Sequence, residues 1–384
     1  MDAYLDYNAT TPIDPRVFEA MKPYLTSEFG NASSFHKKGQ TARHAVELAR
    51  ERIADFLEVE PGDIIFTSGG TESDNLAVRG AVMERMLKRR HLVVSAIEHQ
   101  AVLHTAQHLE KRGVRVSTIP AGKDGVVDLG ALESAVSDET ALVSLMHVNN
   151  ETGVIQPIEE AAKIAHAKGA LFHVDAVQSF GKLKIDIENT GIDLLTLSSH
   201  KICGPKGAGA LHIRKGVKIQ ALLHGGHQEK NIRPGTENVA AIAGFGRAVE
   251  ILKDGHEEEV SRVLKLRNRL EGGLKKMTGV HVNGHETKRI YNTLNISFEG
   301  LDGETLLMNL DLKNIYASTG SACTAGSVEA SHVLIAMGIE EKWTRAPIRF
   351  SLGRFTTEEE IDYVISEIPP MIERLRKAST SHAR

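Results

Sequence analysis

Short apolar runs alternate with helical patterns between residues 63 and 213. Apolar runs bounded by turn-forming residues are typical of buried strands, whereas apolar residues spaced three or four apart are typical of helices. The expected strands are Ile64–Phe66, Leu92–Ser95, Val114–Ile119, Leu142–Met146, Leu171–Val174, Leu194–Ser198 and Ala210–Ile213, with helices at Thr71–Lys88, Gln100–Arg112 and Ile158–Lys168 among them. This alternation predicts an α/β fold built on a mostly parallel, seven-stranded sheet.

The pattern changes after Asn238. A long helical stretch, Val239 to about Met277 with Gly255 as a break, precedes a mixture of strands and helices. We expect strands at Thr293–Phe298 and Ile348–Ser351, a helix near Glu304–Leu310, and a last helix that opens on a capping box at Thr357 and Glu360 and runs to about Lys377. The chain should therefore form a large domain over residues 14–255 and a smaller α+β domain over residues 256–384, with residues 1–13 packed against the smaller one.

Composition narrows the functional classes. Of the 384 residues, 41% are hydrophobic and 25% are charged, as in an ordinary globular protein. A net charge of -4 gives no basic footprint for nucleic acid or a membrane surface. Two cysteines cannot form a disulfide framework or a tetrahedral metal site. The first residues lack the pattern of a signal peptide, and no apolar run could span a bilayer, so we expect a cytoplasmic protein.

Two residues that follow expected strands suggest a cofactor. Asp175 and Lys201 each come at the carboxyl end of an apolar run, where open α/β sheets bind their ligands. A carboxylate that pairs with a pyridinium nitrogen and a lysine that forms a Schiff base are what pyridoxal phosphate (PLP) requires. Taken alone, Lys201 would be interpreted as a surface lysine and Asp175 as a cap or turn residue. Together they favour a PLP site.

A glycine-containing turn at residues 66–73 joins a strand to a helix. Gly70 and Thr71 stand where free backbone N–H groups at the start of a helix can bind an anion. The spacing excludes a Walker loop, and a plain glycine turn is the competing interpretation. Further donors for a phosphate come from Ser198, His200 and Thr236.

Three other polar residues are candidates for binding or catalysis. His99 could stack on an aromatic cofactor and transfer protons, although a single histidine among 18 is more often structural. Asn150 could donate to a cofactor or substrate oxygen, or be an ordinary turn residue. Arg349 lies in an apolar strand, where a guanidinium needs an anionic partner. A substrate carboxylate and an internal salt bridge explain it equally well.

Cys323 lies in a segment of small residues without apolar periodicity, Ser318–Ser327. We expect an exposed, mobile loop that carries a reactive thiol. Cys203, two residues after Lys201, is interpreted as a packing residue.

With these residues placed, the whole chain resembles the NifS/IscS-type cysteine desulfurases, a class-V aminotransferase group of PLP fold-type I. The motifs that carry the resemblance are residues 4–12 (YLDYNATTP), 66–73 (FTSGGTES), 147–151 (HVNNE), 173–178 (HVDAVQ), 199–201 (SHK), 321–323 (SAC) and 349–353 (RFSLG).

The resemblance implies a role for each site residue. Lys201 would carry PLP, Asp175 would pair with its ring nitrogen, and His99 would stack on the ring. Gln178 would contact the phenolic oxygen, and Asn150 would lie against cofactor and substrate. The phosphate would be bound by Gly70, Thr71, Ser198 and His200, with Thr236 from the other subunit of a homodimer. Arg349 would bind the substrate carboxylate, and Cys323 would carry the persulfide.

The implied reaction converts L-cysteine to L-alanine and passes sulfur from Cys323 to an acceptor for iron–sulfur clusters or tRNA thiolation. No metal is expected, apart from contact of Cys323 with an iron–sulfur cluster. Related proteins often have a longer tail that helps to dock the scaffold protein, whereas this sequence ends at Arg384, so the acceptor stays open.

Two alternatives stay open. One is a selenocysteine lyase or another fold-type I lyase or transaminase, although a transaminase needs no protein thiol. The other is a non-catalytic sulfur-carrier or scaffold subunit, which the absence of Lys201 or Asp175 would have favoured.

Overall fold

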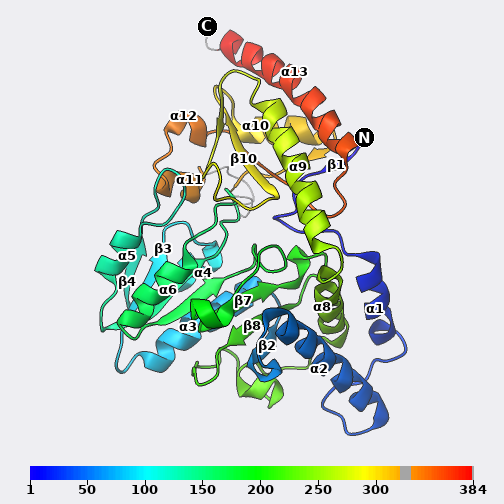
Figure 1. The fold of residues 1–384 in the computed structure, drawn as a ribbon, viewed down its shortest axis with the longest axis vertical. Coiled ribbons are helices and arrows are strands. Elements are labelled where there is room, and N and C mark those ends of the chain that lie inside the picture. The colour runs from blue at the N-terminus through cyan, green and yellow to red at the C-terminus, as the bar shows by residue number, and fades with distance from the viewer. Residues whose placement is uncertain (321–329, 383–384) are drawn as a thin grey trace.

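The computed structural model describes residues 1–320 and 330–382, with side chains as far as residue 378. Its largest element is a seven-stranded sheet in the order β2-β8-β7-β6-β5-β3-β4 (Figure 1). Parallel pairing joins β4, β3, β5, β6 and β7, whereas β8 runs antiparallel to both of its neighbours. The strands are β2 Ile64–Thr67, β3 His91–Ser95, β4 Arg115–Ile119, β5 Thr140–Met146, β6 Leu171–Asp175, β7 Leu194–Ser198 and β8 Gly209–Ile213. The predicted α/β fold with a mostly parallel sheet is confirmed.

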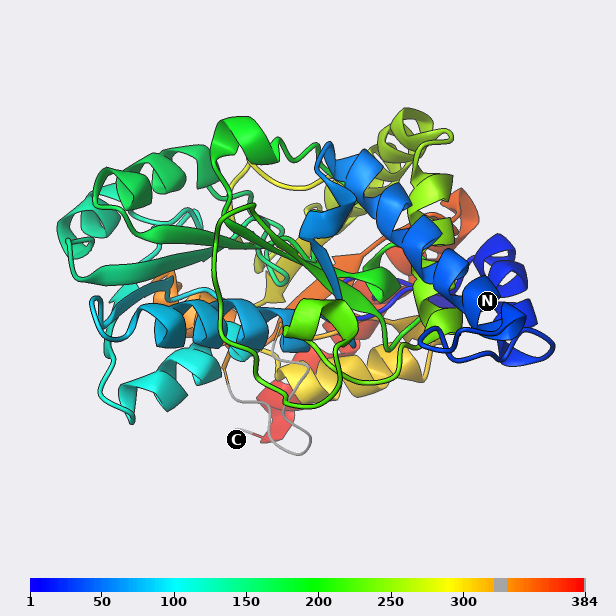
Figure 2. The ribbon, with the colours of Figure 1, turned by 90° about the horizontal axis from the view of Figure 1, so that it is seen from below.

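Helices cover both faces of this sheet (Figure 2). Because successive strand residues point to opposite faces, Leu92 packs in the apolar cluster under α3 and α4, and Val93 packs in the cluster under α5, α6 and α8. The helices of this part are α1 Pro15–Leu25, α2 Lys37–Leu57, α3 Gly70–Arg85, α4 Gln100–Glu110, α5 Leu129–Ala135, α6 Ile158–Ala167, α7 Ile187–Thr190 and α8 Val239–Leu252.

A second apolar core lies in the part of the chain after α8 (Figure 1). It packs α9 and α13 against a three-stranded antiparallel sheet in the order β12-β10-β9. The elements of this part are α9 His256–Leu274, β9 Val280–Val282, β10 Thr293–Phe298, α10 Gly303–Asp311, β11 Ile315–Tyr316, α11 His332–Ala336, α12 Glu341–Thr344, β12 Pro347–Ser351 and α13 Glu358–His382.

The N-terminal segment joins this second core. Strand β1 (Ala3–Tyr4) pairs in parallel with β11, and the side chains of Ala3 and Leu5 are buried with those of α9 and α13. Asp6 forms a bridge to Ser351, and before α1 begins Thr11 N–H donates to the backbone oxygen of His200, just after β7, at 3.1 Å. Residues 6–11 therefore connect the two cores, which places polar groups of this segment between them.

Several expected boundaries shift in the structure. The stretch after Asn238 is two helices, because Gly255 adopts a left-handed φ of 72° and starts α9. The capping box is present: Glu360 N–H donates to Thr357 Oγ1 at 3.3 Å, and Thr357 N–H donates to Glu360 Oε2 at 2.7 Å. Helix α13 runs beyond the expected end, and β4 starts at Arg115, one residue later than expected. Among the described residues, no helix has the length and apolarity needed to cross a bilayer.

Candidate active site

The strand directions bring the candidate residues to one edge of the sheet. Strands β3, β5, β6 and β7 are parallel, so their carboxyl ends meet at the same edge. Strand β2 has the same direction as β7, because both are antiparallel to β8. His99, Asn150, Asp175, Lys201 and Gly70 all lie at or shortly after these carboxyl ends. This edge faces the second core, so the candidate site lies between the two.

Lys201 closes a short 3-10 helix, Ser199–Lys201, directly after β7. Its Nζ donates to the backbone oxygens of Asn8 at 2.5 Å and Ala9 at 2.7 Å. Burial, together with the positive charges of Arg349 and Lys182, lowers the pKa of this amine to about 7. A large part of the amine is therefore neutral near pH 7, as a nucleophile or a base requires.

Asp175 is the last residue of β6 and is only 5% exposed. Its Oδ1 accepts a hydrogen bond from Val177 N–H at 2.9 Å, which orients the carboxylate. Burial raises the pKa of Asp175, against the opposing effects of His99, the Val177 amide and Lys201. A cationic group beside this carboxylate would favour its ionised form.

His99 immediately precedes α4 and caps it. Its Nδ1 accepts a hydrogen bond from Ala101 N–H at 3.1 Å, so in a neutral ring the proton lies on Nε2. Burial lowers the pKa of His99, while the charge of Asp175 opposes the shift. The imidazole is thus held neutral in a fixed orientation.

Gln178 lies three residues after Asp175 and shares a partner with Lys201. Its Nε2 donates to the backbone oxygen of Asn8 at 3.0 Å, the same oxygen that accepts from Lys201. Lys182 donates to Gln178 Oε1 at 3.3 Å. Burial lowers the pKa of Lys182 to about 8, so the site contains a second buried amine.

The start of α3 has the features of an anion site. Gly70 is the first residue of α3, and a Cβ built on it would lie 3.8 Å from the Cβ of Ser198. Ser198 Oγ is buried and has no hydrogen-bond partner among the described residues. Thr71 is exposed in the first turn of the helix. Free N–H groups at a helix start next to an unpaired hydroxyl suit a phosphate.

The other two candidate phosphate ligands lie in different surroundings. His200 Nδ1 is 3.1 Å from Thr10 Oγ1, and burial lowers the pKa of this imidazole to about 4. Thr236 is exposed and lies in the loop before α8. Arg233 in the same loop pairs with Glu72 of α3 at 2.8 Å. The structure therefore places Thr236 on the surface of the chain.

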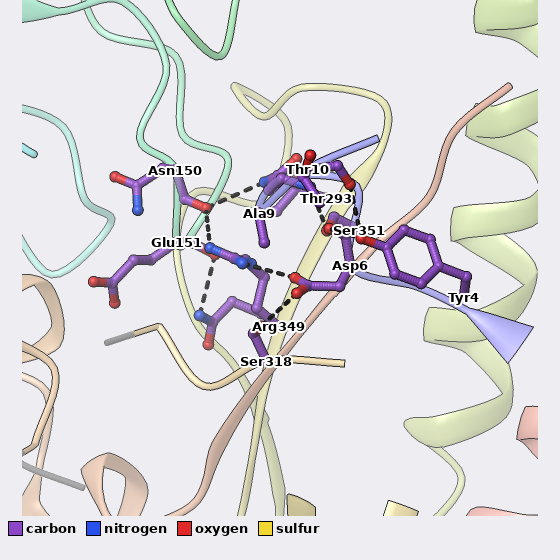
Figure 3. Close-up of polar contacts among 12 residues, drawn as sticks. Tyr4, Asp6, Ala9, Thr10, Asn150, Glu151, Thr293, Ser318, Arg349 and Ser351 are labelled. Atoms are coloured by element: carbon purple, nitrogen blue, oxygen red, sulfur yellow. Dashed lines mark hydrogen bonds and ion pairs between the residues drawn. The ribbon is translucent and has the colours of Figure 1, made fainter. Parts of the chain in front are cut away.

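Arg349 lies in β12, and its side chain is 3% exposed (Figure 3). Nη2 pairs with Asp6 at 2.8 Å, and Nη1 donates to the backbone oxygen of Asn150 at 3.0 Å. The internal salt bridge considered from the sequence is therefore present. Nε is buried and has no partner among the described residues, so the guanidinium retains capacity for another anion. Asn150 contacts Arg349 through its backbone oxygen, which leaves its side-chain amide for other groups.

The two cysteines differ. Cys203 is buried, its N–H donates to Thr11 Oγ1 at 2.9 Å, and burial raises the pKa of its thiol. Cys323 lies outside the described residues, as do residues 321–327 of the expected exposed loop. The prediction is wrong for the first three residues of that loop, because Ser318, Thr319 and Gly320 are buried. Residues next to that segment are described: Ser318 pairs through its backbone with Arg349.

The residues at this edge suit PLP. The hydroxyl of Ser198 needs a partner next to a helix start, which a phosphate provides. The Lys201 amine has a lowered pKa, and the Asp175 carboxylate is buried. These are the groups that bind a phosphate, an aldehyde and a pyridinium nitrogen.

Sequence reasoning missed the backbone oxygens of Asn8 and Ala9, which bind Lys201, and the carboxylate of Asp6, which binds Arg349. All three lie in the segment 4–12, which the sequence analysis used only for the family resemblance. A polar segment that follows a short apolar strand was the available signal. Its partners could not be named, because they lie nearly 200 or more residues away in the chain.

The fold and the chemistry of this edge define a PLP-dependent enzyme of fold-type I. Comparison with known proteins agrees. Residues 3–364 match the aminotransferase class-V family. The cysteine desulfurase IscS of Methanosarcina thermophila is 49% identical over 98% of this chain and 93% of its own.

Solved structures give the same result. A NifS-like protein superposes with a TM-score of 0.92 at 40% identity, over 98% of this chain and 100% of that one. The structure of SspA in complex with cysteine superposes with a TM-score of 0.81 at 36% identity, over 92% of this chain and 100% of that one. The chain belongs to the class-V aminotransferase family and, within it, to the cysteine desulfurases of the NifS/IscS type.

Proposed function

We propose that this protein is a PLP-dependent cysteine desulfurase that converts L-cysteine to L-alanine and leaves the sulfur as a persulfide on Cys323. The observation that carries the proposal is that the Lys201 amine and Arg349 bind the same N-terminal segment. Lys201 donates to the backbone oxygens of Asn8 and Ala9, and Arg349 pairs with Asp6. A reactive amine thus lies near a guanidinium that can bind an amino-acid carboxylate. The cysteine-bound structure of the related SspA supports the choice of substrate.

The proposed site residues have distinct tasks. Lys201 would hold PLP, Asp175 would pair with its ring nitrogen, and Gln178 would contact its phenolic oxygen. His99 would stack on the ring. Gly70, Thr71, Ser198 and His200 would bind the phosphate. When bound, PLP withdraws electron density from the Cα of an amino acid, which protein side chains cannot do.

The chain itself would supply binding and proton transfer. Arg349 would bind the substrate carboxylate through Nε, and the Asn150 side chain would help to orient it. The neutral Lys201 amine would remove the Cα proton, and His99 would assist in proton transfer. The Cys323 thiolate would attack the substrate sulfur: an S–S bond forms, the C–S bond breaks, and the three-carbon product takes up a proton to leave as alanine.

We infer a cytoplasmic location, where the thiols of Cys203 and Cys323 stay reduced, and transfer of the persulfide to an iron–sulfur scaffold or a tRNA-thiolation enzyme. Large and small domains of residues 14–255 and 256–384 would enclose the site, with residues 1–13 on the small domain. The identity of the acceptor needs binding experiments with each candidate.

The direct test is incubation of the PLP-loaded protein with L-cysteine, with and without a thiol reductant. We expect equal amounts of alanine and sulfide when reductant is present, and alanine limited to about one equivalent per active site when it is absent, since the persulfide is not discharged. Release of pyruvate would favour the lyase alternative. Release of selenium from selenocysteine, without release of sulfur from cysteine, would favour it too.

We expect a homodimer in which Thr236 of each protomer serves the phosphate of the other. Thr236 is exposed in its own protomer. Phe35 is 90% exposed and lies beside His227, in the loop that continues to Thr236. An apolar side chain so exposed suits an interface. Sedimentation of the active, PLP-loaded protein should give a dimer, and Phe35→Ser should weaken it. An active monomer at working concentration would contradict this arrangement.

The pKa of Lys201 predicts how PLP uptake depends on pH. An amine with a pKa of about 7 is protonated below pH 7 and neutral above it. The rate of covalent attachment of PLP to the apoprotein should therefore rise about tenfold per pH unit below pH 7 and level off above it. Absorbance measurements of PLP uptake between pH 5.5 and about 9 would check this. A rate that keeps rising toward pH 10 would indicate an ordinary lysine.

A further inference from the structure

Glu151 is a buried carboxylate that the proposed chemistry does not use. It follows Asn150 in the turn after β5 and is 1% exposed. The backbone of Glu151 is held in place: its N–H donates to Asn149 Oδ1 at 3.0 Å, and its oxygen accepts from Asn295 Nδ2 at 3.1 Å. Figure 3 shows its side chain directed away from Arg349. The carboxylate therefore has another task than pairing with that arginine.

The carboxylate of Glu151 contacts three residues that are distant in sequence: His332 Nδ1 lies 4.0 Å from Oε1, and Ser331 and Gly320 contact the other oxygen. Ser331 Oγ donates a hydrogen bond to Oε2. Gly320 packs against the same oxygen, so closely that a Cβ built on it would overlap Oε2. Gly320 and Ser331 flank the segment 321–329, which contains Cys323. One buried side chain thus touches the chain just before this segment and just after it.

The chain next to each of these two residues is also fixed to the site by other contacts. Before the segment, Ser318 N–H donates to the Arg349 backbone oxygen at 3.3 Å, and Arg349 N–H donates in return at 2.6 Å. After it, Ser331 Oγ accepts from Leu334 N–H at 3.2 Å and so caps α11. His332 Nε2 lies 3.0 Å from the backbone oxygen of Glu98, next to His99.

Burying a carboxylate between these two parts of the chain costs desolvation free energy. Burial raises the pKa of Glu151, against the hydrogen bond from Ser331 and the charges of His332 and Arg349. Oε2 makes both contacts, with Ser331 and with Gly320, so a glutamine that places its amide oxygen there would keep both at a lower desolvation cost. What the carboxylate adds is Oε1, which lies 4.0 Å from His332 Nδ1.

We propose that Glu151 is a positioning residue that holds Gly320 and Ser331 at a fixed separation, and that sulfur transfer through Cys323 depends on this contact. This inference rests on the proposed function for its consequence in sulfur transfer. The positioning itself is a property of described residues.

Three single substitutions disturb the same contact from different sides. Glu151→Ala removes the carboxylate, Ser331→Ala removes the hydroxyl, and Gly320→Ala pushes the carboxylate away. Each should leave PLP content and the cysteine-dependent change in cofactor absorbance close to wild type. Each should slow persulfide formation on Cys323 by about tenfold to a hundredfold, since small misplacements of a reacting group cost rate on this scale.

Amide hydrogen exchange gives a readout that does not depend on activity. In the three variants, exchange should rise in peptides that cover residues 316–320 and 330–337 and stay unchanged in β6 and β7. Gly272→Ala is the matched control for Gly320→Ala, because a Cβ at Gly272 meets nothing within 4 Å. Asp193→Asn is the control for loss of a buried carboxylate, since Asp193 pairs with His166 and Arg214 before β7. Neither control variant should bind cysteine normally and yet be slow in sulfur transfer.

The outcomes distinguish this inference from the proposed function. Unchanged exchange in both peptides would show that Glu151 does not position them. Increased exchange with persulfide formation at the wild-type rate would show that the positioning does not serve the reaction. If the wild-type protein itself forms no persulfide on Cys323, the proposed function fails. The exchange measurement still decides whether Glu151 fixes the chain at Gly320 and at Ser331. Should one variant fail to fold, the other two still test the same contact.

Discussion

Replacing Lys201 with alanine is expected to abolish sulfide release from L-cysteine, with a loss of about a thousandfold or more in kcat. The substitution removes both the covalent attachment of PLP and the amine that would take up the Cα proton, and a positioned base alone contributes about 10²–10⁴ in rate. The fold should tolerate the change, because burial of this amine costs free energy that an alanine does not incur. Alanine production measured by amino-acid analysis checks the prediction.

Two controls make this test specific. Lys206→Ala removes an exposed lysine of the same loop and should leave turnover intact. Lys182 is the stronger competitor, because it is also buried with a lowered pKa, and it contacts Gln178. Borohydride reduction of the holoenzyme followed by peptide mapping should place the PLP label on Lys201. A label on Lys182, or near wild-type turnover in Lys201→Ala, would show that the assignment is wrong.

The large sheet could be predicted from the sequence because each strand carries its own signal. Runs such as Leu142–Met146 are buried on both faces of the sheet, so they are apolar except for Ser144, and polar turn residues mark their ends. The carboxyl ends of these strands then predict a common edge for Asp175 and Lys201. No knowledge of long-range contacts is needed for that inference, because parallel strands with helical crossovers have one geometry.

Helix α2 shows where the analysis of the sequence fell short. Its buried residues include Ala42, Val46, Ala49, Ile53 and Leu57, which follow a helical spacing. Small alanines and the many charged residues between them weaken the apolar signal, so no element was expected there. The stripe of small residues permits close packing against α8, where the Cβ position of Gly246 would lie 2.6 Å from the Cβ of Ala49. That packing cannot be read from α2 alone.

The connections between the two cores were equally inaccessible to the sequence. Asp6 lies 343 residues from Arg349, and Asn8 lies 193 residues from Lys201. Neither the charge of Asp6 nor the backbone oxygen of Asn8 has a sequence signal that names its partner. The sequence could state that Arg349 needs an anion, but only the structure identifies Asp6 as the internal one.

Replacing Cys323 with serine is expected to stop sulfur transfer, while PLP binding and the cysteine-dependent change in absorbance persist. Of the two thiols in the chain, that of Cys203 is buried, and burial raises its pKa, so little thiolate is available from it near pH 7. Since the thiolate is the nucleophile, the persulfide should form on Cys323, and its loss should reduce persulfide yield by about a hundredfold or more.

Cys203→Ser is the matched control, because it removes the other thiol with the same change of atom. The variant should remain largely active, with a loss of stability of about 1 kcal/mol from placing a hydroxyl in a packed position. Mass spectrometry of peptides after exposure of each variant to L-cysteine locates the added sulfur. Sulfur on Cys203 in the wild-type protein, or an active Cys323→Ser variant, would contradict the mechanism. Sulfur on Cys323 in both the wild type and Cys203→Ser would assign the acceptor thiol, because the only other cysteine is then absent.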